Sequence, residues 1–282
     1  EPDVRDILQE HHVPVFDAAT DACFKMLRGY MDYGRFLQSH PVVAKNGAPA
    51  NAQRPEAAGI LRSPRSGGML EPESTAELLD AYGFKCAASI SAGTEDEAKT
   101  AAATLGYPVI LKAIVPDIAH RSDAGLVSRK IENDVELHRE YGALESRARA
   151  LSQGESTVSV EKFIPHDFEV ILGVKYDPTF GPVILCGLGG IFTEVLQDYA
   201  LRLAPLAAID AQIMLSSLKA FPILQKMAAP GWNPIALLSD ALLRLSDLAV
   251  ELQGQINAVD INPIALVTGS SEIAVLDAKI HV

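Results

Sequence analysis

The chain has 282 residues, with 24 Lys and Arg against 36 Asp and Glu, and its formal net charge is −12 at pH 7. A hydrophobic fraction of 48% and mixed helix and strand patterns indicate a folded chain rather than a disordered one. The negative charge argues against a nucleic-acid backbone as the main partner, and no apolar run reaches transmembrane length. Cys23, Cys86 and Cys186 fit neither a disulfide framework nor a zinc site, which favours a reducing, cytoplasmic location.

The first 72 residues differ from the rest of the chain. Residues 1–40 contain a predicted short strand at 13–16 and a predicted helix at 18–36, which is too little to bury a core alone. Residues 41–72 hold five prolines and many small residues, so we interpret them as a linker or an extended crossing segment. Its basic side chains would lie along an acidic surface, or the segment would be a plain tether.

From residue 74 onward the pattern is regular. A capping box formed by Thr94 and Glu97 begins one helix. Helices are expected at 75–82, 94–105, 134–151, 209–221 and 235–253. Strands are expected at 86–90, 108–114, 126–131, 158–163, 169–175, 182–186, 256–261 and 273–276, with 126–131 antiparallel to 108–114. This order predicts an α+β (α/β) chain whose two lobes, 73–155 and 156–282, leave a ligand cleft between them.

Lys112 lies inside the apolar strand VILKAI. A lysine is costly to bury there unless it meets an anion such as phosphate, although it would also fit the exposed face of an edge strand. The loop that follows carries His120, Arg121 and Ser122 between two aspartates. It could bind an anion, with His120 as acid, base or nucleophile, or it could be a polar turn.

The strand VSVEKF ends in Glu161, Lys162 and Phe163, just before a proline. Such a strand end could form a hinge between lobes, where backbone groups read a purine edge. Strands also end in Glu-Lys without any such role.

A glycine-rich stretch, CGLGGIFTE, follows a predicted strand and precedes a predicted helix. Gly187, Gly189 and Gly190 would let backbone N–H groups approach phosphate, although their spacing matches neither standard nucleotide fingerprint. Glu194 could orient a metal, a basic group or the histidine. The alternative is a tight turn between strand and helix.

Two closing strands carry oxygen ligands. In AVDINP, alternation places Asp260 and Asn262 on one face of a strand, and Asp277 of VLDAK could join them from the neighbouring strand. Two or three such oxygens together with nucleotide phosphates are a usual way to hold Mg²⁺. A strand end capped by Asn-Pro is the alternative interpretation.

The stretch EVILGVKYDPTFGPVILCGLGGIFTEVLQDYALRLAPL (169–206) resembles the ATP-grasp region of the NDP-forming acyl-CoA synthetases. This family includes ADP-forming acetate–CoA ligases and is related to the β-subunit of succinyl-CoA synthetase. The segments DIAHRSDAGLV, AVDINPIAL and VLDAKI resemble other motifs of the same family, so the resemblance covers about residues 73–282. It implies an ATP-grasp fold, with ATP and Mg²⁺ as cofactors and coenzyme A as co-substrate. It also implies ligation of a carboxylic acid to coenzyme A, through an acyl phosphate and a phosphohistidine.

The resemblance also implies a role for each matching residue. His120 would take part in phosphoryl transfer on the nucleotide-side loop. The remaining roles are phosphate contact by Lys112; the adenine hinge by Glu161, Lys162 and Phe163; the phosphate loop by Gly187, Gly189 and Gly190; the phosphoryl site by Glu194 and Arg202; and Mg²⁺ binding by Asp260, Asn262 and Asp277.

The implied partners are CoA-ligase domains that carry the primary phosphohistidine, either on a separate chain or in a preceding part. Residues 1–40 resemble the tail of such a part. We expect an oligomer acting on a small carboxylic acid such as acetate, another short-chain acid or a hydroxycinnamate, without nucleic acid or membrane. Two alternatives are an ATP-grasp ligase joining a carboxylate to an amine, and a non-catalytic regulatory ATP-grasp module.

Overall fold

The computed structural model describes residues 20–39, 54–62, 65–66, 68–115, 124–151, 157–190 and 197–282. The chain divides into two units, residues 1–50 and 51–282. In the first unit, helix α2 (Thr20–Ser39) agrees with the helix predicted at 18–36, and it exposes the side chains of Phe24, Leu27 and Tyr30. The strand predicted at 13–16 lies outside the described residues. In the described ranges, no helix is both long enough and apolar enough to cross a bilayer.

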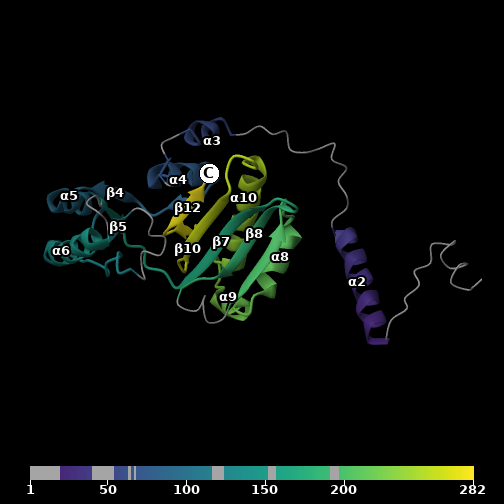
Figure 1. Cartoon of the computed structure of the whole chain (residues 1–282). Coiled ribbons are helices and arrows are strands. Elements are labelled where there is room, and N and C mark those ends of the chain that lie inside the picture. Colours follow the sequence, from purple (N-terminus) through teal and green to yellow (C-terminus); the bar gives the residue numbers. More distant parts are fainter. Residues whose placement is uncertain are drawn as a thin grey trace, which may run out of the picture. The chain divides into compact units, whose positions relative to one another are not determined.

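A large, mainly antiparallel sheet forms the centre of the second unit (Figure 1). Its path runs β1-β2-β12-β10-β7-β8-β9, and β11 and β3 join at one side. The strands are β1 (Arg65–Ser66), β2 (Met69–Leu70), β3 (Lys85–Cys86), β7 (Phe168–Asp177), β8 (Gly181–Leu188), β9 (Tyr199–Leu203), β10 (Ala258–Leu266), β11 (Ala274–Val275) and β12 (Ala278–His281).

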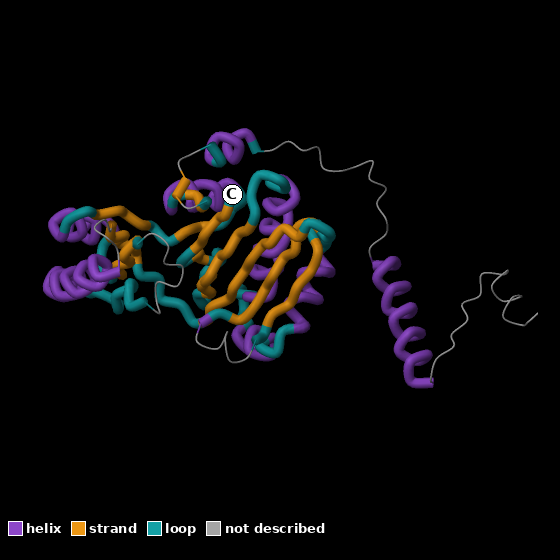
Figure 2. The backbone as a smooth tube through the Cα atoms, in the orientation of Figure 1, coloured by secondary structure: helices purple, strands orange, loops and turns teal. Residues whose placement is uncertain are grey.

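Helices cover one face of this large sheet, as Figure 2 shows by the helices behind its strands. Every second residue of the central strands, such as Leu172, Ile184 and Ile261, is fully buried in the core beneath α8, α9 and α10. The helices of this lobe are α3 (Pro55–Ile60), α4 (Pro72–Ala81), α8 (Ala208–Ser217), α9 (Phe221–Met227) and α10 (Pro234–Glu251). The alternation leaves the other side-chain row of each strand on the opposite, open face.

A second, three-stranded sheet has the order β4-β6-β5 and its own core. The strands are β4 (Ser89–Ala92), β5 (Val109–Ile114) and β6 (Thr157–Lys162), and the helices α5 (Glu95–Leu105) and α6 (Asp134–Leu151) pack on one face. The predicted helix start is confirmed at the N-cap Thr94, whose hydroxyl accepts a bond from the Glu97 amide (3.2 Å). The Glu97 carboxylate accepts its bond from the Gly93 amide (2.7 Å), whereas a capping box would use the Thr94 amide, so the predicted box is only half formed. The predicted pairing of 126–131 with 108–114 is present as single bridges from Val109 to Ile131 and from Lys112 to Val127.

The lobe boundaries differ from the expected ones. Residues 73–86, expected in the first lobe, belong to the large lobe, because Leu78, Leu79 and Phe84 are fully buried in its core. The strand predicted at 86–90 is two strands, β3 and β4, one in each sheet. The small lobe is therefore an insertion, entered after β3 and left after β6.

The predicted linker 41–72 is also too long. Residues 54–62 form α3 and the turn after it, and β1 and β2 extend the large sheet. Ala57, Leu61 and Leu70 are at most 5% exposed. These apolar residues bury against the large lobe, so the second half of the segment is part of the folded unit.

Candidate active site

The small sheet has one apolar and one polar face. Leu111 and Val160 are fully buried on the helix-covered face, whereas Lys112 shares the other face with Ser159 and Glu161 of β6. Lys112 is nevertheless only 6% exposed. The polar face is therefore covered by something other than the helices of its own lobe.

Lys112 itself shows what lies there. Its ammonium group contacts the Glu161 carboxylate at 2.8 Å and donates a hydrogen bond to the Leu276 carbonyl at 2.7 Å. Leu276 lies between β11 and β12, in the large lobe. Lys112 thus bridges the two lobes. It lies in a buried strand beside a carboxylate, and its predicted contact with ATP phosphate stays a prediction.

Burial raises the pKa of the Glu161 carboxyl above its ordinary value, and the attraction of Lys112 offsets part of that rise. Asp277 adds to the rise, so this carboxylate is within electrostatic reach of Glu161. Burial likewise raises the pKa of the Cys86 thiol to about 11, with smaller contributions from Glu161 and Asp277. Two carboxyl groups, one ammonium group and one neutral thiol therefore gather at the junction of the lobes.

The predicted hinge, residues 161–163, is at the end of β6. The Lys162 amide donates to the Ala88 carbonyl (2.8 Å), and the Phe163 amide donates to the Pro108 carbonyl (3.1 Å), so both are used by the sheet. The next amide, that of Ile164, has no partner among the described residues. Sequence reasoning missed Ile164, because pairing in the sheet decides which hinge amide remains available.

The Lys162 side chain is not on the face of the small sheet that carries Lys112 and Glu161. Its ammonium group donates to the carbonyls of Gly106 (2.6 Å) and Tyr107 (3.2 Å), just after α5. Phe163 is partly buried, and the Lys130 ammonium lies 5.7 Å from its ring centroid. The contribution of Lys162 to a hinge would therefore come from its backbone.

The glycine turn leaves the large sheet at the end of β8. The Gly189 amide donates to the Glu169 carbonyl at 2.9 Å. A Cβ atom on Gly189 would lie 2.8 Å from backbone and side-chain carbon atoms of Glu169, so no larger residue fits. Gly190 has φ +71°, which favours glycine. The structure thus explains two of the three predicted glycines by close packing and backbone conformation.

The three predicted metal ligands come from adjoining strands. The Asn262 amide donates to the Asp277 carbonyl at 3.0 Å, and Asp260 is two residues before Asn262 on β10, opposite Lys279 of β12. Among the described residues, no group of three or more His, Cys, Asp or Glu side chains is placed to hold a metal ion. Two carboxylates and one amide remain a suitable donor set for Mg²⁺ that also binds phosphate oxygens, and this role stays a prediction.

Arg202 does not face the same way as Asp260. In the sheet register Arg202 pairs with Ile184, which is fully buried on the helix-covered face. Asp260 pairs with Gly173, and Gly173 pairs with Leu185, which is on the opposite face. Because directly paired residues share a face, Arg202 and Asp260 lie on opposite faces of the large sheet, and the place of Arg202 at the phosphoryl site stays a prediction.

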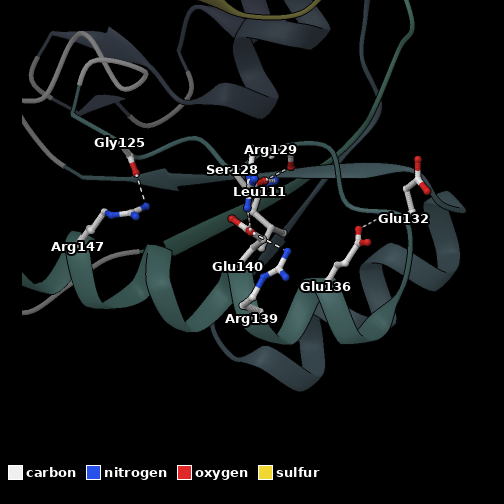
Figure 3. A network of polar contacts seen from close by, with 9 residues as sticks. All are labelled: Leu111, Gly125, Ser128, Arg129, Glu132, Glu136, Arg139, Glu140 and Arg147. Atoms are coloured by element: carbon white, nitrogen blue, oxygen red, sulfur yellow. Dashed lines mark hydrogen bonds and ion pairs between the residues drawn. The ribbon is translucent and has the colours of Figure 1, made fainter.

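The segment 124–131 runs along the edge of β5 and is bonded to Leu111, the neighbour of Lys112 (Figure 3). The Leu111 amide donates to the Ser128 hydroxyl, and the Ser128 amide donates to the Leu111 carbonyl, both at 2.8 Å. On α6, Arg147 donates to the Gly125 carbonyl at 3.3 Å. These bonds fix the end of the segment that returns to β5 from residues 116–123. His120 lies in that segment and Glu194 in 191–196, so both predicted residues are outside the described part of the chain.

The two sheets with their helices, joined at Lys112, have the architecture of an ATP-grasp protein. The ATP-grasp domain family matches residues 62–282. A 4-hydroxybutyrate–CoA ligase (ADP-forming) of Nitrosopumilus maritimus is 31% identical over 278 residues, which cover 98% of this chain and 39% of that protein. The β subunit of acetate–CoA ligase (ADP-forming) I of Pyrococcus furiosus is 38% identical over 200 residues, 70% of this chain and 84% of that subunit. The chain belongs to the ATP-grasp family of ADP-forming acid–CoA ligases, and it spans about two fifths of the longer relative.

Solved structures give the same assignment. An acetyl-coenzyme A synthetase 1 of Ca. Korarchaeum cryptofilum, in complex with coenzyme A and Ca-AMPCP, aligns with a TM-score of 0.67 and 31% identity over 74% of this chain and 91% of that chain. A protein of Pyrococcus horikoshii aligns with a TM-score of 0.70 and 33% identity over 80% of this chain and 97% of that chain. The predicted ATP-grasp fold is confirmed.

Proposed function

We propose that this chain is the ATP-binding part of an ADP-forming acid–CoA ligase. The observation that carries the proposal is the buried pair of Lys112 and Glu161, on the polar face of the small sheet and in contact with the large lobe. A buried ammonium group in a cleft is suited to the negative charge of nucleotide phosphates. The relatives named as ADP-forming acid–CoA ligases supply the class of reaction.

The nucleotide would lie between the polar face of the small sheet and the open face of the large one. The Ile164 amide, which has no partner among the described residues, would donate a hydrogen bond to a purine ring nitrogen, and the glycine turn would approach the phosphates. Lys112 would then exchange its bond with Glu161 for one with a phosphate oxygen. Asp260, Asn262 and Asp277 would hold Mg²⁺, which supplies charge neutralisation when bound.

The acceptor of the phosphoryl group would be carried by another part of the ligase. One solved relative, a Ca. Korarchaeum cryptofilum acetyl-coenzyme A synthetase with coenzyme A and Mg-AMPPCP, is described with its phosphohistidine segment pointing towards the nucleotide-binding site. It is 29% identical to this chain with a TM-score of 0.62. By analogy, His120 and Glu194 would act at the phosphate end of the cleft, and the CoA and acid sites would lie on the partner part.

Calorimetric titration with a magnesium complex of a non-hydrolysable ATP analogue tests nucleotide binding by the chain. Lys112→Gln should lower the affinity about tenfold or more, because a charge-assisted bond to phosphate is lost. Lys99→Gln is the matched control: Lys99 also pairs with a carboxylate, Glu95 at 2.6 Å, but on α5. Equal affinities for the two variants would contradict the proposed site.

The reaction itself is tested on the complete ligase, by following ADP release with a panel of acids and with coenzyme A or amines as acceptors. ADP release that requires coenzyme A is the expected result. Release that requires an amine would point to the carboxylate–amine ligase, and nucleotide binding without any release would point to a regulatory module.

A further inference from the structure

His166 connects the two ends of the proposed nucleotide site. It lies between β6 and β7, and its side chain is 22% exposed. One ring nitrogen, Nδ1, is 2.8 Å from the Ile164 carbonyl oxygen in the hinge. The other, Nε2, is 2.8 Å from Oε1 of Glu169 at the start of β7. The ring therefore contacts the hinge on one side and a carboxylate on the other.

Glu169 in turn supports the glycine turn. Its carbonyl accepts the Gly189 amide at 2.9 Å, and its Oε2 is 3.1 Å from the position a Cβ would take on Gly190. Contacts thus link Ile164 through His166 and Glu169 to Gly189, and the Glu169 carboxylate lies beside Gly190. They join the proposed base-binding end of the cleft to the proposed phosphate-binding end.

The partners of the ring impose a condition on its protons. A carbonyl oxygen and a carboxylate oxygen are both acceptors, whereas a neutral imidazole has one donor and one acceptor nitrogen. Both contacts are hydrogen bonds only if the His166–Glu169 pair holds one more proton than a neutral ring and a free carboxylate. The pair then has no net charge. Without that proton it would carry one negative charge beside the turn that is proposed to receive phosphates.

We propose that His166 is a positioning residue of the nucleotide site: as an imidazolium it joins the hinge to the glycine turn and neutralises Glu169. This inference rests on the proposed function and adds a residue to it. Neither the sequence pattern nor the resemblance pointed to His166. A chain without this ring would keep a negative carboxylate at the turn, and it would bind nucleotide phosphates more weakly through repulsion.

Charge rescue provides the test. Affinity for the magnesium complex of a non-hydrolysable ATP analogue is measured by calorimetry on the full chain at pH 7. His166→Gln should bind about tenfold more weakly, because Glu169 is left negative, and the double variant His166→Gln, Glu169→Gln should recover most of that loss. His138→Gln is the control, since His138 makes the same 2.8 Å contact with a carboxylate, Glu95, on the surface of the small lobe.

The protonation state is read separately, by nitrogen-15 NMR of histidine-labelled protein. Signals of both His166 ring nitrogens as protonated groups are expected at pH 7. A neutral His166 ring, an unchanged affinity of His166→Gln, or a double variant as weak as the single one would each overturn the inference. Failure of the wild-type chain to bind the nucleotide would instead refute the proposed function, and the NMR result would stand apart from it.

Discussion

Replacing Lys112 with methionine isolates the energetic role of the buried pair at the lobe junction. The side chains of Lys112 and Glu161 are 8% and 13% exposed and lie 2.8 Å apart. Methionine fills similar space but leaves the Glu161 carboxylate without its counter-charge. Removing one partner of a buried pair typically costs about 3–5 kcal/mol. For a folded unit of this size we expect a fall in Tm on the order of 10 °C.

The loss should depend on pH. Burial already raises the pKa of Glu161, and removing Lys112 removes the main influence that lowers it. A carboxyl whose pKa is higher in the folded than in the unfolded state binds its proton more tightly when folded. The variant should therefore be most stable below the unfolded pKa and should lose stability as the pH rises through the folded pKa. Calorimetric scans of Lys112→Met and wild type at several values between pH 4 and 8 measure this.

Two comparisons sharpen the result. The double variant Lys112→Met, Glu161→Gln removes the uncompensated charge, so it should recover much of the stability and lose the pH dependence. Lys85→Met breaks an exposed pair with Asp80, in which both side chains are more than half exposed, and should leave Tm nearly unchanged. A pH-independent loss in Lys112→Met, or a double variant less stable than the single one, would refute the reasoning.

Gly189→Ala should destabilise the fold by about 1–3 kcal/mol in denaturant unfolding, because the new Cβ would lie 2.8 Å from atoms of β7. Gly142→Ala in α6 is the control: no atom lies within 4 Å of its Cβ position, so it should be neutral or stabilising. Asp198→Ala should cost about 1–3 kcal/mol in the same assay, because the buried Asp198 carboxylate accepts hydrogen bonds from two backbone amides at the start of α9, at 2.7 and 2.8 Å. An unchanged unfolding midpoint would show that these amides find other partners. Arg54→Ala should speed amide hydrogen exchange in α3, because the Arg54 guanidinium lies 4.5 Å from the Tyr82 ring centroid and joins α3 to α4. Exchange that stays slow would show that the apolar contacts of α3 hold the helix in place without Arg54.

Local rules predicted much of the small lobe from the sequence. Thr94 is the expected N-cap and accepts the Glu97 amide, and residues 134–151 form the expected helix without a shift at either end. The apolar strand around Lys112 implied a buried lysine that needed an anion. These features depend on neighbours within a few positions, and the chain alone contains that information.

The segment 54–70 shows where composition misleads. Its prolines and glycines resemble a linker, yet Ala57, Leu61 and Leu70 bury against the large lobe. A short apolar segment has no detectable period, and its burial depends on a surface formed by residues far along the chain. Tertiary contact rather than local propensity decides that it folds.

The register of the strands in the large sheet could not be predicted from the sequence either. Whether Arg202 shares a face with Asp260 depends on the pairing of four strands, and a shift of one residue would reverse the answer. Lys112 and Leu276 are 164 positions apart, and the bond between them uses a main-chain carbonyl. No side-chain pattern at Leu276 could have indicated that contact. Lys112 meets the connection that carries Asp277 because the small lobe is inserted into the large one. The chain enters the small lobe after β3, and β3 pairs in parallel with β11, which directly precedes that connection. The polar face of the small sheet therefore lies against the connection.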